Sequence, residues 1–555
     1  MTAKLPVDRL ATGGFILLFA LAQLVLSFRL NINWDEYFFL SHIYAFEQDR
    51  LTTAMQTFYV RPLAWLSWLP GSEADQVVYG RLFMMACEAG SLFCLYRIAR
   101  RFFGTSEALL AVAAWCGAGF ALVHGASFRA DPFAGVLMMT SLALLLCERL
   151  TLVRGAMAGL LAALGLMVTL KSVFFLPPFL AAFILRGVEE GADRWMLALR
   201  HFAVAGCVCI ASLAVLWLWH SRGLPAAPMV IAPGKSTTLT SGSLDVLDKV
   251  ILSQALFPRL PDIAIWFSQS VFLIFLCIAG LWLAFRHICR KHDRALGIAL
   301  FLFALPLVSL VFYRNAFPYF FPFILLPVAL LAAAGASSII KPLHRITLVA
   351  GMAVFVALRL VSSWQIDQSA QREISAAVHE AFPEPVAYID RNGMLPSFPK
   401  SGFFMSTWGT EQYLDGKHPP IADTIRQDQP PLLILNTPLL EDAALGTSQY
   451  GNFRLKAGDS AMLRENYVEH WGPIWVAGKT IDHSADRFEI VLAGTYTLEC
   501  EGRALIKGRS VQCGSTLALD EGMHSWRGPV AVLRWGRNLP RPDQQPPTAP
   551  IYYGF

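Results

Sequence analysis

The sequence predicts a polytopic α-helical membrane protein of about eleven spans, followed by an extracytoplasmic α/β plus β-sandwich region. Of its 555 residues, 55% are hydrophobic and only 15% are charged, whereas a soluble globular chain has roughly 25% charged residues. Apolar runs long enough to cross a bilayer, about 20 residues each, recur as far as residue 363. Beyond that point the composition becomes more polar and no further run of this length occurs.

Eleven apolar runs are the candidate spans. The fifth and sixth are short and meet at Lys171, so we expect a tight hairpin there. Arg81 and Glu88 lie inside the second run, where they could form an internal ion pair or simply pack. The runs are residues 10–28, 79–97, 107–124, 132–149, 155–170, 171–186, 202–219, 264–285, 295–312, 318–336 and 346–363.

The loops between the runs predict the orientation of the chain. If the N-terminus lies inside, all the inside loops are rich in Arg and Lys, as the positive-inside rule requires. This distribution accounts for the net charge of +5 without a nucleic-acid partner. It also places the loop after the first span, and the whole region after residue 363, on the outside of the membrane.

Three domains are expected. The spans form a catalytic domain over residues 1–363, an α/β region follows over 364–465, and a β-sandwich-like region with a Pro-rich tail occupies 466–555. Cys500 and Cys513 are the only cysteines of this polar part, and an extracytoplasmic location permits a disulfide between them. Four tryptophans could stack on sugars or lie in the core: Trp408, Trp471, Trp475 and Trp526.

A short acidic stretch, residues 31–38, directly follows the first apolar run. Asp35 and Glu36 stand there between Trp34 and Tyr37. Trp and Tyr collect at membrane interfaces as anchors, but ionisable groups at this depth are costly and usually functional. The stretch therefore predicts a catalytic cavity on the outer face, with Asp35 as the catalytic carboxylate and Glu36 as its alternative or support.

Other outside loops bring further charged side chains to the same level. Asp131 is a second candidate catalytic carboxylate. Arg and Lys suit a phosphate group and a carboxylate can accept a proton from an attacking hydroxyl, so the cavity suits a phosphate-bearing lipid substrate. The candidate substrate-binding residues are Arg61, His124, Arg129, Lys171, Tyr313 and Arg314.

Three of these cations have a structural alternative. Arg129 could pair only with Asp131, two residues away. Lys171 could extend its ammonium group to the membrane interface, and Arg314 could be an interface anchor.

Four short motifs, in this order and at these span ends, resemble the GT-C superfamily of membrane glycosyltransferases that use polyprenyl-phosphate sugars. Within it, the similar branch contains the dolichyl-phosphate-mannose protein mannosyltransferases and the bacterial aminoarabinose transferase acting on lipid A. The resemblance covers roughly residues 10–360. It is carried by Trp34-Asp35-Glu36, by Arg129-Ala130-Asp131-Pro132, by residues 165–171 and by residues 313–319.

The resemblance implies roles for the matching positions. Asp35 would be a catalytic base or an acceptor-orienting group, and Asp131 would have a supporting or metal-related role. Arg129, Lys171 and Arg314 would contact the phosphate of the donor. The large C-terminal region has no counterpart in these relatives, which leaves the acceptor open.

The predicted function is that of an inverting glycosyltransferase that moves a hexosyl or pentosyl group from a polyprenyl-phosphate donor. The acceptor would be extracytoplasmic: a cell-envelope glycan, a lipid such as the lipid A part of lipopolysaccharide, or a protein. No His/Cys ligand set for a metal is visible, and a divalent metal is possible but not required. The predicted location is a bacterial inner membrane with the C-terminal region in the periplasm.

Two other classes of function stay open from the sequence. A transporter or flippase for a lipid-linked sugar would have helices broken near mid-membrane, whereas the charges here lie at the ends of the spans. A non-catalytic protein of envelope glycan assembly is the other class.

Overall fold

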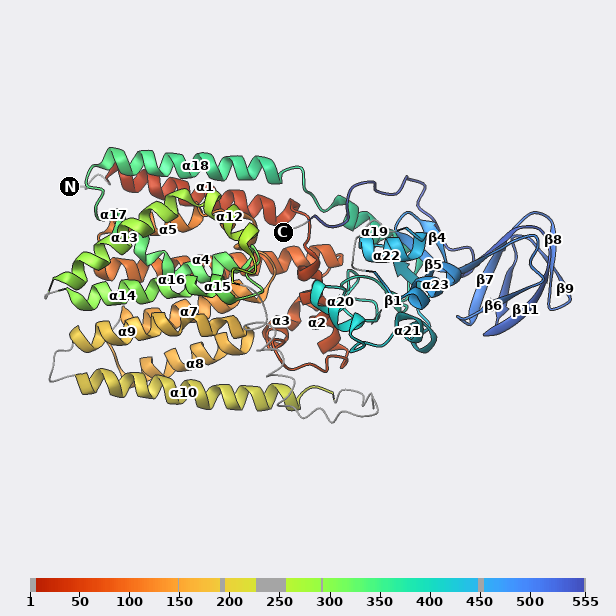
Figure 1. The fold of residues 1–555 in the computed structure, drawn as a ribbon, viewed down its shortest axis with the longest axis horizontal. Helices are drawn as coiled ribbons and strands as arrows, with labels where there is room; N and C mark the ends of the chain where they lie inside the picture. Colours follow the sequence, from red (N-terminus) through yellow and green to blue (C-terminus); the bar gives the residue numbers. More distant parts are fainter. Residues whose placement is uncertain are drawn as a thin grey trace.

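A computed structural model describes residues 6–147, 149–189, 195–225, 256–290, 293–447 and 454–553. Helices with roughly parallel axes form a bundle at one end of the elongated molecule, and the C-terminal region continues its long axis at the other end (Figure 1). Short elements of the first outer loop, α2 and α3, lie where the two parts meet (Figure 1).

In the described residues, ten apolar helical segments and a broken eleventh make up the bundle. Seven are long and apolar enough to cross a membrane: α1 (Val7–Arg29), α4 (Glu73–Phe102), η2 and α9 within Leu170–Val188, α10 (Trp195–Arg222), α13 (Val271–Cys289), the α14–α15 segment Arg294–Phe312, and α18 (Pro342–Ser363). Three are shorter: α5 (Thr105–Cys116), α7 (Ala130–Leu146) and α8 (Leu152–Val168). The last consists of α16 (Phe320–Val328) and α17 (Leu330–Ala336).

Each of the eleven predicted runs coincides with a helical segment, so the polytopic helical prediction is confirmed. Two boundaries differ. The run over 264–285 is divided at Ser270, with α12 (Leu260–Gln269) before it and α13 after it, because Ser270 leaves the helical conformation. The run over 107–124 stops being helical at Cys116 and resumes only at α6 (Ala121–His124), since Gly117 and Gly119 intervene.

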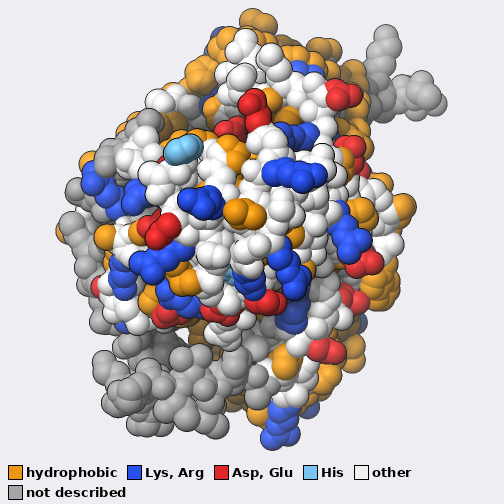
Figure 2. Space-filling view, turned by 90° about the vertical axis from the view of Figure 1, so that its right-hand side faces the viewer, with side chains coloured by type: hydrophobic (Ala, Val, Ile, Leu, Met, Phe, Trp, Pro, Cys, Tyr) orange, Lys and Arg blue, Asp and Glu red, His pale blue; other side chains and the backbone are white. Residues whose placement is uncertain are grey.

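Large apolar side chains cover the outside of the bundle. Leu18, Ile210, Phe275 and Leu358 are each about 60–70% exposed on α1, α10, α13 and α18. The far end of the C-terminal region instead carries interspersed Lys, Arg, Asp and Glu (Figure 2). The contrast is that of a lipid-facing bundle joined to a water-exposed domain.

The C-terminal region begins as a small α/β unit. Strands β1 and β3 are parallel neighbours and β1 also pairs in parallel with β2. The two buried strands β1 and β3 lie in the short apolar segments 385–390 and 431–436. The elements are α19 (Ser369–Ala381), β1 (Tyr388–Ile389), β2 (Lys400–Ser401), α20 (Thr407–Leu414), α21 (Ile421–Asp428), β3 (Leu432–Ile434), α22 (Pro438–Leu445) and α23 (Ala457–Asn466).

The remaining strands form two sheets. An eight-stranded sheet has the order β10-β7-β12-β5-β3-β1-β2, with β4 pairing β5, so it contains strands from both sides of residue 465. A four-stranded sheet has the order β6-β11-β8-β9. The strands are β4 (Tyr467–Trp471), β5 (Ile474–Ile481), β6 (Arg487–Ile490), β7 (Gly494–Glu499), β8 (Arg503–Ile506), β9 (Arg509–Gln512), β10 (Thr516–Leu519), β11 (Gly522–Arg527) and β12 (Ala531–Trp535).

Burial explains two of the four tryptophans. Trp526 is 4% exposed and packs with Tyr496, Leu498 and Ile506, and Trp471 is 6% exposed. These two are core residues and not sugar platforms. Cys500 and Cys513, whose pairing the sequence permits, form a disulfide with a Cα–Cα distance of 5.1 Å.

The carboxylate of Glu73 joins the bundle to the C-terminal region. Glu73 begins α4 and is buried, and its oxygens accept hydrogen bonds from Ser375 (2.9 Å), His379 (2.9 Å) and Ser397 (2.5 Å). Ser375 and His379 belong to α19, so this helix is fixed to the outer end of α4. A second connection is the ion pair between Arg314 of the bundle and Glu411 of α20, at 2.9 Å.

The His379–Glu73 pair predicts a pH-dependent contact between the two parts. The hydrogen bond to Glu73 raises the pKa of His379 above 6.5, so its stabilising effect is complete below about pH 6.5 and is lost as the pH rises through the raised pKa. Because the imidazole is 43% exposed, we expect His379→Gln to lower the melting temperature by only about 1–2 °C at pH 6. The difference should shrink at pH 8.5. An equal difference at both pH values would contradict a role for the charge.

Candidate active site

The acidic stretch begins a helix and is shaped by its cap. Asn33 is the N-cap of α2 (Trp34–Glu47), and its side chain accepts a hydrogen bond from Asp35 N at 3.0 Å. The Glu36 carboxylate accepts one in return from Asn33 N at 2.9 Å. This reciprocal arrangement is a capping box, and the positive end of the helix dipole favours both carboxylates.

Glu36 is fully engaged inside the protein. It is 1% exposed, and Arg81 donates two hydrogen bonds to its oxygens, at 2.8 and 2.6 Å. Phe128 N donates a further one at 2.8 Å. Burial by itself would raise the pKa of Glu36, but the charge and hydrogen bonds of Arg81 and the backbone donors lower it. All its oxygens are occupied, which leaves none directed at a substrate.

The expected alternative of an Arg81–Glu88 ion pair is wrong. Arg81 uses its guanidinium on Glu36 and on the backbone oxygens of the first outer loop and α1. Glu88 instead accepts a hydrogen bond from Gln23 of α1 at 2.9 Å. The pairing partner lies 45 residues away from Arg81 in the chain, so spacing within one helix could not reveal it.

Asp35 belongs to a chain of alternating charges. Its Oδ2 lies 2.6 Å from Nη2 of Arg129, and the carboxylate is 16% exposed. Asp131 lies 3.9 Å from Nε of Arg129 and 2.7 Å from Nζ of Lys171. Burial by itself would lower the pKa of Arg129, but Asp35 raises it above its usual value. Two carboxylates and two cations are thus neutralised pairwise at the outer end of the bundle.

Tyr319 lies under this chain of charges. The guanidinium of Arg129 is 3.3 Å from the centroid of the Tyr319 ring, and the ammonium of Lys171 is 4.7 Å from it. Such contacts orient cations over an aromatic face. Tyr319 precedes α16 and thereby brings the last motif of the resemblance to the first two.

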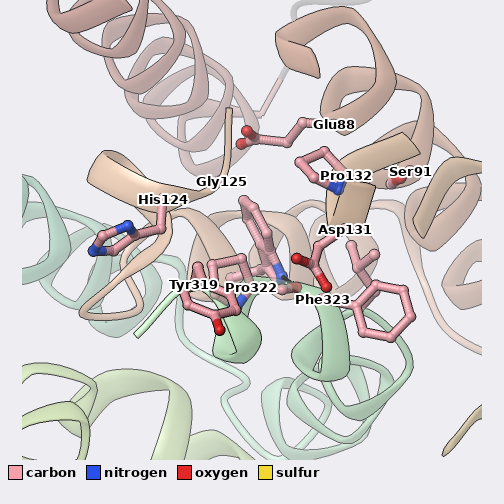
Figure 3. Close-up of a pocket in the computed structure, with 11 residues that line it drawn as sticks. Glu88, Ser91, His124, Gly125, Asp131, Pro132, Tyr319, Pro322 and Phe323 are labelled. Atoms are coloured by element: carbon pink, nitrogen blue, oxygen red, sulfur yellow. Dashed lines mark hydrogen bonds between the residues drawn. The ribbon is translucent and has the colours of Figure 1, made fainter. Parts of the chain in front are cut away.

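A small pocket lies next to Asp131 and Tyr319 (Figure 3). The Asp131 carboxylate and the Tyr319 ring approach its centre, while the carboxylate of Glu88 lies at its edge (Figure 3). The lining residues are Glu88, Ser91, Trp115, His124, Gly125, Asp131, Pro132, Tyr319, Pro322, Phe323 and Leu326. The lining therefore combines two carboxylates with mainly apolar side chains.

The other predicted binding residues are distributed around this centre. His124 lines the pocket, and Tyr313 is 8% exposed and packs against Phe174 and Phe320. Arg314 faces the C-terminal region through Glu411. Arg61 lies apart: it donates to Nδ1 of His220 at 2.9 Å and stacks on Trp219 at 4.1 Å.

One cation near the site was not predicted from the sequence. Arg259 precedes α12, its guanidinium lies 3.8 Å from the centroid of Phe317, and its Nε donates to the backbone oxygen of Arg314 at 3.1 Å. Among the described residues no carboxylate lies within 4.0 Å of it. Only the fold brings Arg259 beside the motif at 313–319.

The carboxylates of the site do not gather into a metal-ligand cluster. In the described part of the chain, no group of three or more His, Cys, Asp or Glu side chains could hold a metal ion. Asp35 and Asp131 each have a cationic partner instead.

Comparisons with known proteins bear on the fold that carries this arrangement. Residues 66–219 match the family model described as dolichyl-phosphate-mannose-protein mannosyltransferase, while no curated protein matches the chain by sequence. The structure is similar to that of ArnT from Cupriavidus metallidurans, solved with undecaprenyl phosphate, with a TM-score of 0.55 and 15% identity over 79% of this chain and 95% of that one.

A second similar structure is the oligosaccharyltransferase of Archaeoglobus fulgidus in its apo form. The TM-score is 0.53 and the identity 12%, over 92% of this chain and 76% of that one. Another structure of the archaeal enzyme, AglB with an inhibitory peptide and a dolichol-phosphate, gives a TM-score of 0.50 at 12% identity over the same shares. The chain therefore has the fold of the GT-C superfamily of membrane glycosyltransferases, as its four sequence motifs predict.

Proposed function

We propose that the protein is an inverting glycosyltransferase that transfers a sugar from a polyprenyl phosphate to an extracytoplasmic acceptor. The observation that carries this proposal is the partly exposed Asp35 carboxylate, paired with Arg129, whose guanidinium lies over the ring of Tyr319, a residue that lines the pocket. The similar structures support it, since one holds undecaprenyl phosphate and another a dolichol-phosphate. The protein lies in a membrane, and we place it in a bacterial inner membrane with its C-terminal region in the periplasm.

In the proposed reaction, the acceptor hydroxyl attacks the anomeric carbon of the donor. A new bond forms between the acceptor oxygen and that carbon, and the bond from the carbon to the phosphate oxygen breaks. Asp35 accepts the proton of the hydroxyl, and the polyprenyl phosphate leaves with its charge stabilised by nearby cations. Attack opposite the leaving group inverts the anomeric configuration.

Asp35 is a better candidate for the base than Asp131 or Glu36. Its carboxylate is 16% exposed and has a single ionic partner, whereas Asp131 is 5% exposed and lies between Arg129 and Lys171. Both carboxylate oxygens of Glu36 already accept hydrogen bonds within the protein. We therefore assign the proton transfer to Asp35, the orientation of Arg129 and Lys171 to Asp131, and the fixing of the loop to Glu36.

We assign the donor phosphate to a set of cations that differs from the set expected from the sequence. Arg129, Lys171 and Arg314 each already have a carboxylate partner within 3 Å. Arg259 has none within 4.0 Å in the described ranges. We assign the phosphate first to Arg259, with Arg314 and Tyr319 beside it, because a guanidinium without a carboxylate at ion-pair distance gains most from binding a phosphate.

This assignment predicts the effect of Arg259→Ala. We expect kcat/KM for the lipid donor to fall about 10- to 100-fold, since a hydrogen bond to a charged group contributes about 1.5–3 kcal/mol. Arg259→Lys should recover part of the loss. Steady-state transfer kinetics at varied donor concentration would measure it, with Arg290→Ala after α13 as the control. If Arg259→Ala has wild-type kinetics, the phosphate must instead be assigned to the paired cations Arg129, Lys171 and Arg314.

Transfer itself is tested with the purified protein in nanodiscs that contain a mixture of polyprenyl-phosphate sugars and envelope extract. Mass spectrometry should show one lipid-linked sugar consumed, free polyprenyl phosphate released, and an acceptor increased in mass by that sugar. Movement of the intact lipid-linked sugar across a vesicle bilayer without cleavage would identify a flippase. If the lipid-linked sugar is neither consumed nor moved, the result would favour a non-catalytic assembly protein.

A further inference from the structure

The C-terminal strap, residues 540–553, returns from the sandwich to the first outer loop. It follows β12, and Figure 1 shows the end of the chain beside the outer end of α1. Two side chains of β4 hold its beginning: His470 bonds to the backbone oxygen of Pro540 at 2.9 Å, and Trp471 donates to that of Gln544 at 2.9 Å. The strap thus has a defined path across the C-terminal region.

The backbone of Ile551 is bonded to the loop that precedes α2. Its carbonyl oxygen accepts hydrogen bonds from the side chains of Asn31, at 3.1 Å, and Gln371, at 2.9 Å. Gln371 also bonds to both backbone groups of Ile32, at 2.9 and 2.7 Å. Asn31 and Gln371 are 6% and 0% exposed, so these bonds form away from competing water.

The hydroxyl of Tyr552 is linked to Trp34, the first residue of α2, through the side chain of Asn392. This hydroxyl donates to the side-chain oxygen of Asn392 at 2.9 Å, and the Asn392 amide donates to the backbone oxygen of Trp34 at 2.9 Å. The ring of Tyr552 also makes edge contacts with those of Trp34 and Tyr37, at centroid distances of 6.1 and 6.5 Å. Asn392 is fully buried in the turn after β1.

These contacts involve residues on both sides of Asp35 in the sequence, and none of them involves the Asp35 carboxylate. The loop before α2 is held by α19 and the strap, and Trp34 is held by the turn after β1. A displacement of about 1 Å at a reacting group can lower a rate 100-fold, so the position of α2 matters to the proposed proton transfer. We propose that Tyr552 and Asn392 are positioning residues for Asp35, an inference that rests on the proposed function.

The experiment compares Tyr552→Phe, Tyr552→Ala and, as the control, Tyr553→Phe in the full-length protein in nanodiscs. Tyr553 is the adjacent tyrosine and makes none of these contacts in the described structure. We expect kcat to fall about 5-fold in Tyr552→Phe and about 30-fold in Tyr552→Ala, with KM for the donor within about 2-fold of the wild type. Tyr553→Phe should match the wild type.

Hydrogen exchange gives a readout that does not depend on activity. In Tyr552→Ala, the backbone amides of residues 32–38 should exchange about 10-fold faster, while those of α13 stay unchanged. Unchanged exchange in residues 32–38 would overturn the inference, and so would an equal loss of kcat in Tyr553→Phe. If the wild type transfers no sugar but exchange accelerates as expected, the proposed function fails while the structural link to α2 stands.

Discussion

Replacing Asp35 by Asn is expected to lower kcat about 1,000-fold, because general base catalysis by a positioned carboxylate contributes roughly 100- to 10,000-fold. Asn has nearly the same shape and can still accept a hydrogen bond from Arg129, so the loop should keep its conformation. KM for the lipid donor should change little, since the amide removes a proton acceptor and not a phosphate ligand. Single-turnover transfer from the identified lipid-linked sugar measures the chemical step directly.

The matched control is Asp49→Asn, an exposed residue just after α2 whose backbone adopts a positive φ of 52° that Asn tolerates. It should retain wild-type kinetics. Full activity in a folded Asp35→Asn variant would exclude Asp35 as the base and transfer that role to Asp131. Equal losses in Asp35→Asn, in Asp131→Asn and in the double variant would indicate that the two carboxylates act as one unit.

Replacing Glu36 by Gln should be the most destabilising of these substitutions. It would leave the Arg81 guanidinium, which is 4% exposed, without its counter-charge in the bundle. Removing one partner of a buried ion pair costs about 3–5 kcal/mol. We expect a large drop in the denaturation midpoint measured in detergent, together with lower yields of folded protein.

A double-variant cycle separates the ion pair from other effects of Glu36. Glu36→Gln combined with Arg81→Met removes both charges, and it should be more stable than Glu36→Gln alone. The exposed pair Asp423–Arg426, at 3.6 Å, is the control, and Asp423→Asn should change stability by less than about 0.5 kcal/mol. If Glu36→Gln keeps wild-type stability and only activity is lost, Glu36 takes part in catalysis.

Local sequence signals predicted the fold and the level of the site, because both depend on short-range properties. Hydropathy locates the spans, and the order of charged loops places Asp35 and Asp131 on the same face of the membrane. These local signals could not predict which of the charged groups form ion pairs with one another. Arg129 is two residues from Asp131, yet its closer contact is Asp35, 2.6 Å away and brought there by the packing of α2 against the bundle.

The same limit applies to Arg259 and to two strands of the sandwich. Arg259 directly precedes α12, which is separated from α13 at Ser270, whereas hydropathy reads both helices as one apolar run. Strands β9 and β11 contain mainly polar residues on their outward faces, so neither has an apolar run that would predict a strand. Contacts between distant segments, and not composition, decide these features.

The bond between Asn31 and Ile551 joins residues that are 520 positions apart. Ribosomes add about 5–20 residues per second, so the loop that carries Asp35 leaves the ribosome about 25–100 s before the strap does. During synthesis the bundle can insert while the start of α2 still lacks its last neighbour. A chain that is interrupted before Ile551 would therefore lack this bond to the acidic loop, and the surroundings of Asp35 are complete only when residues 540–553 have been made.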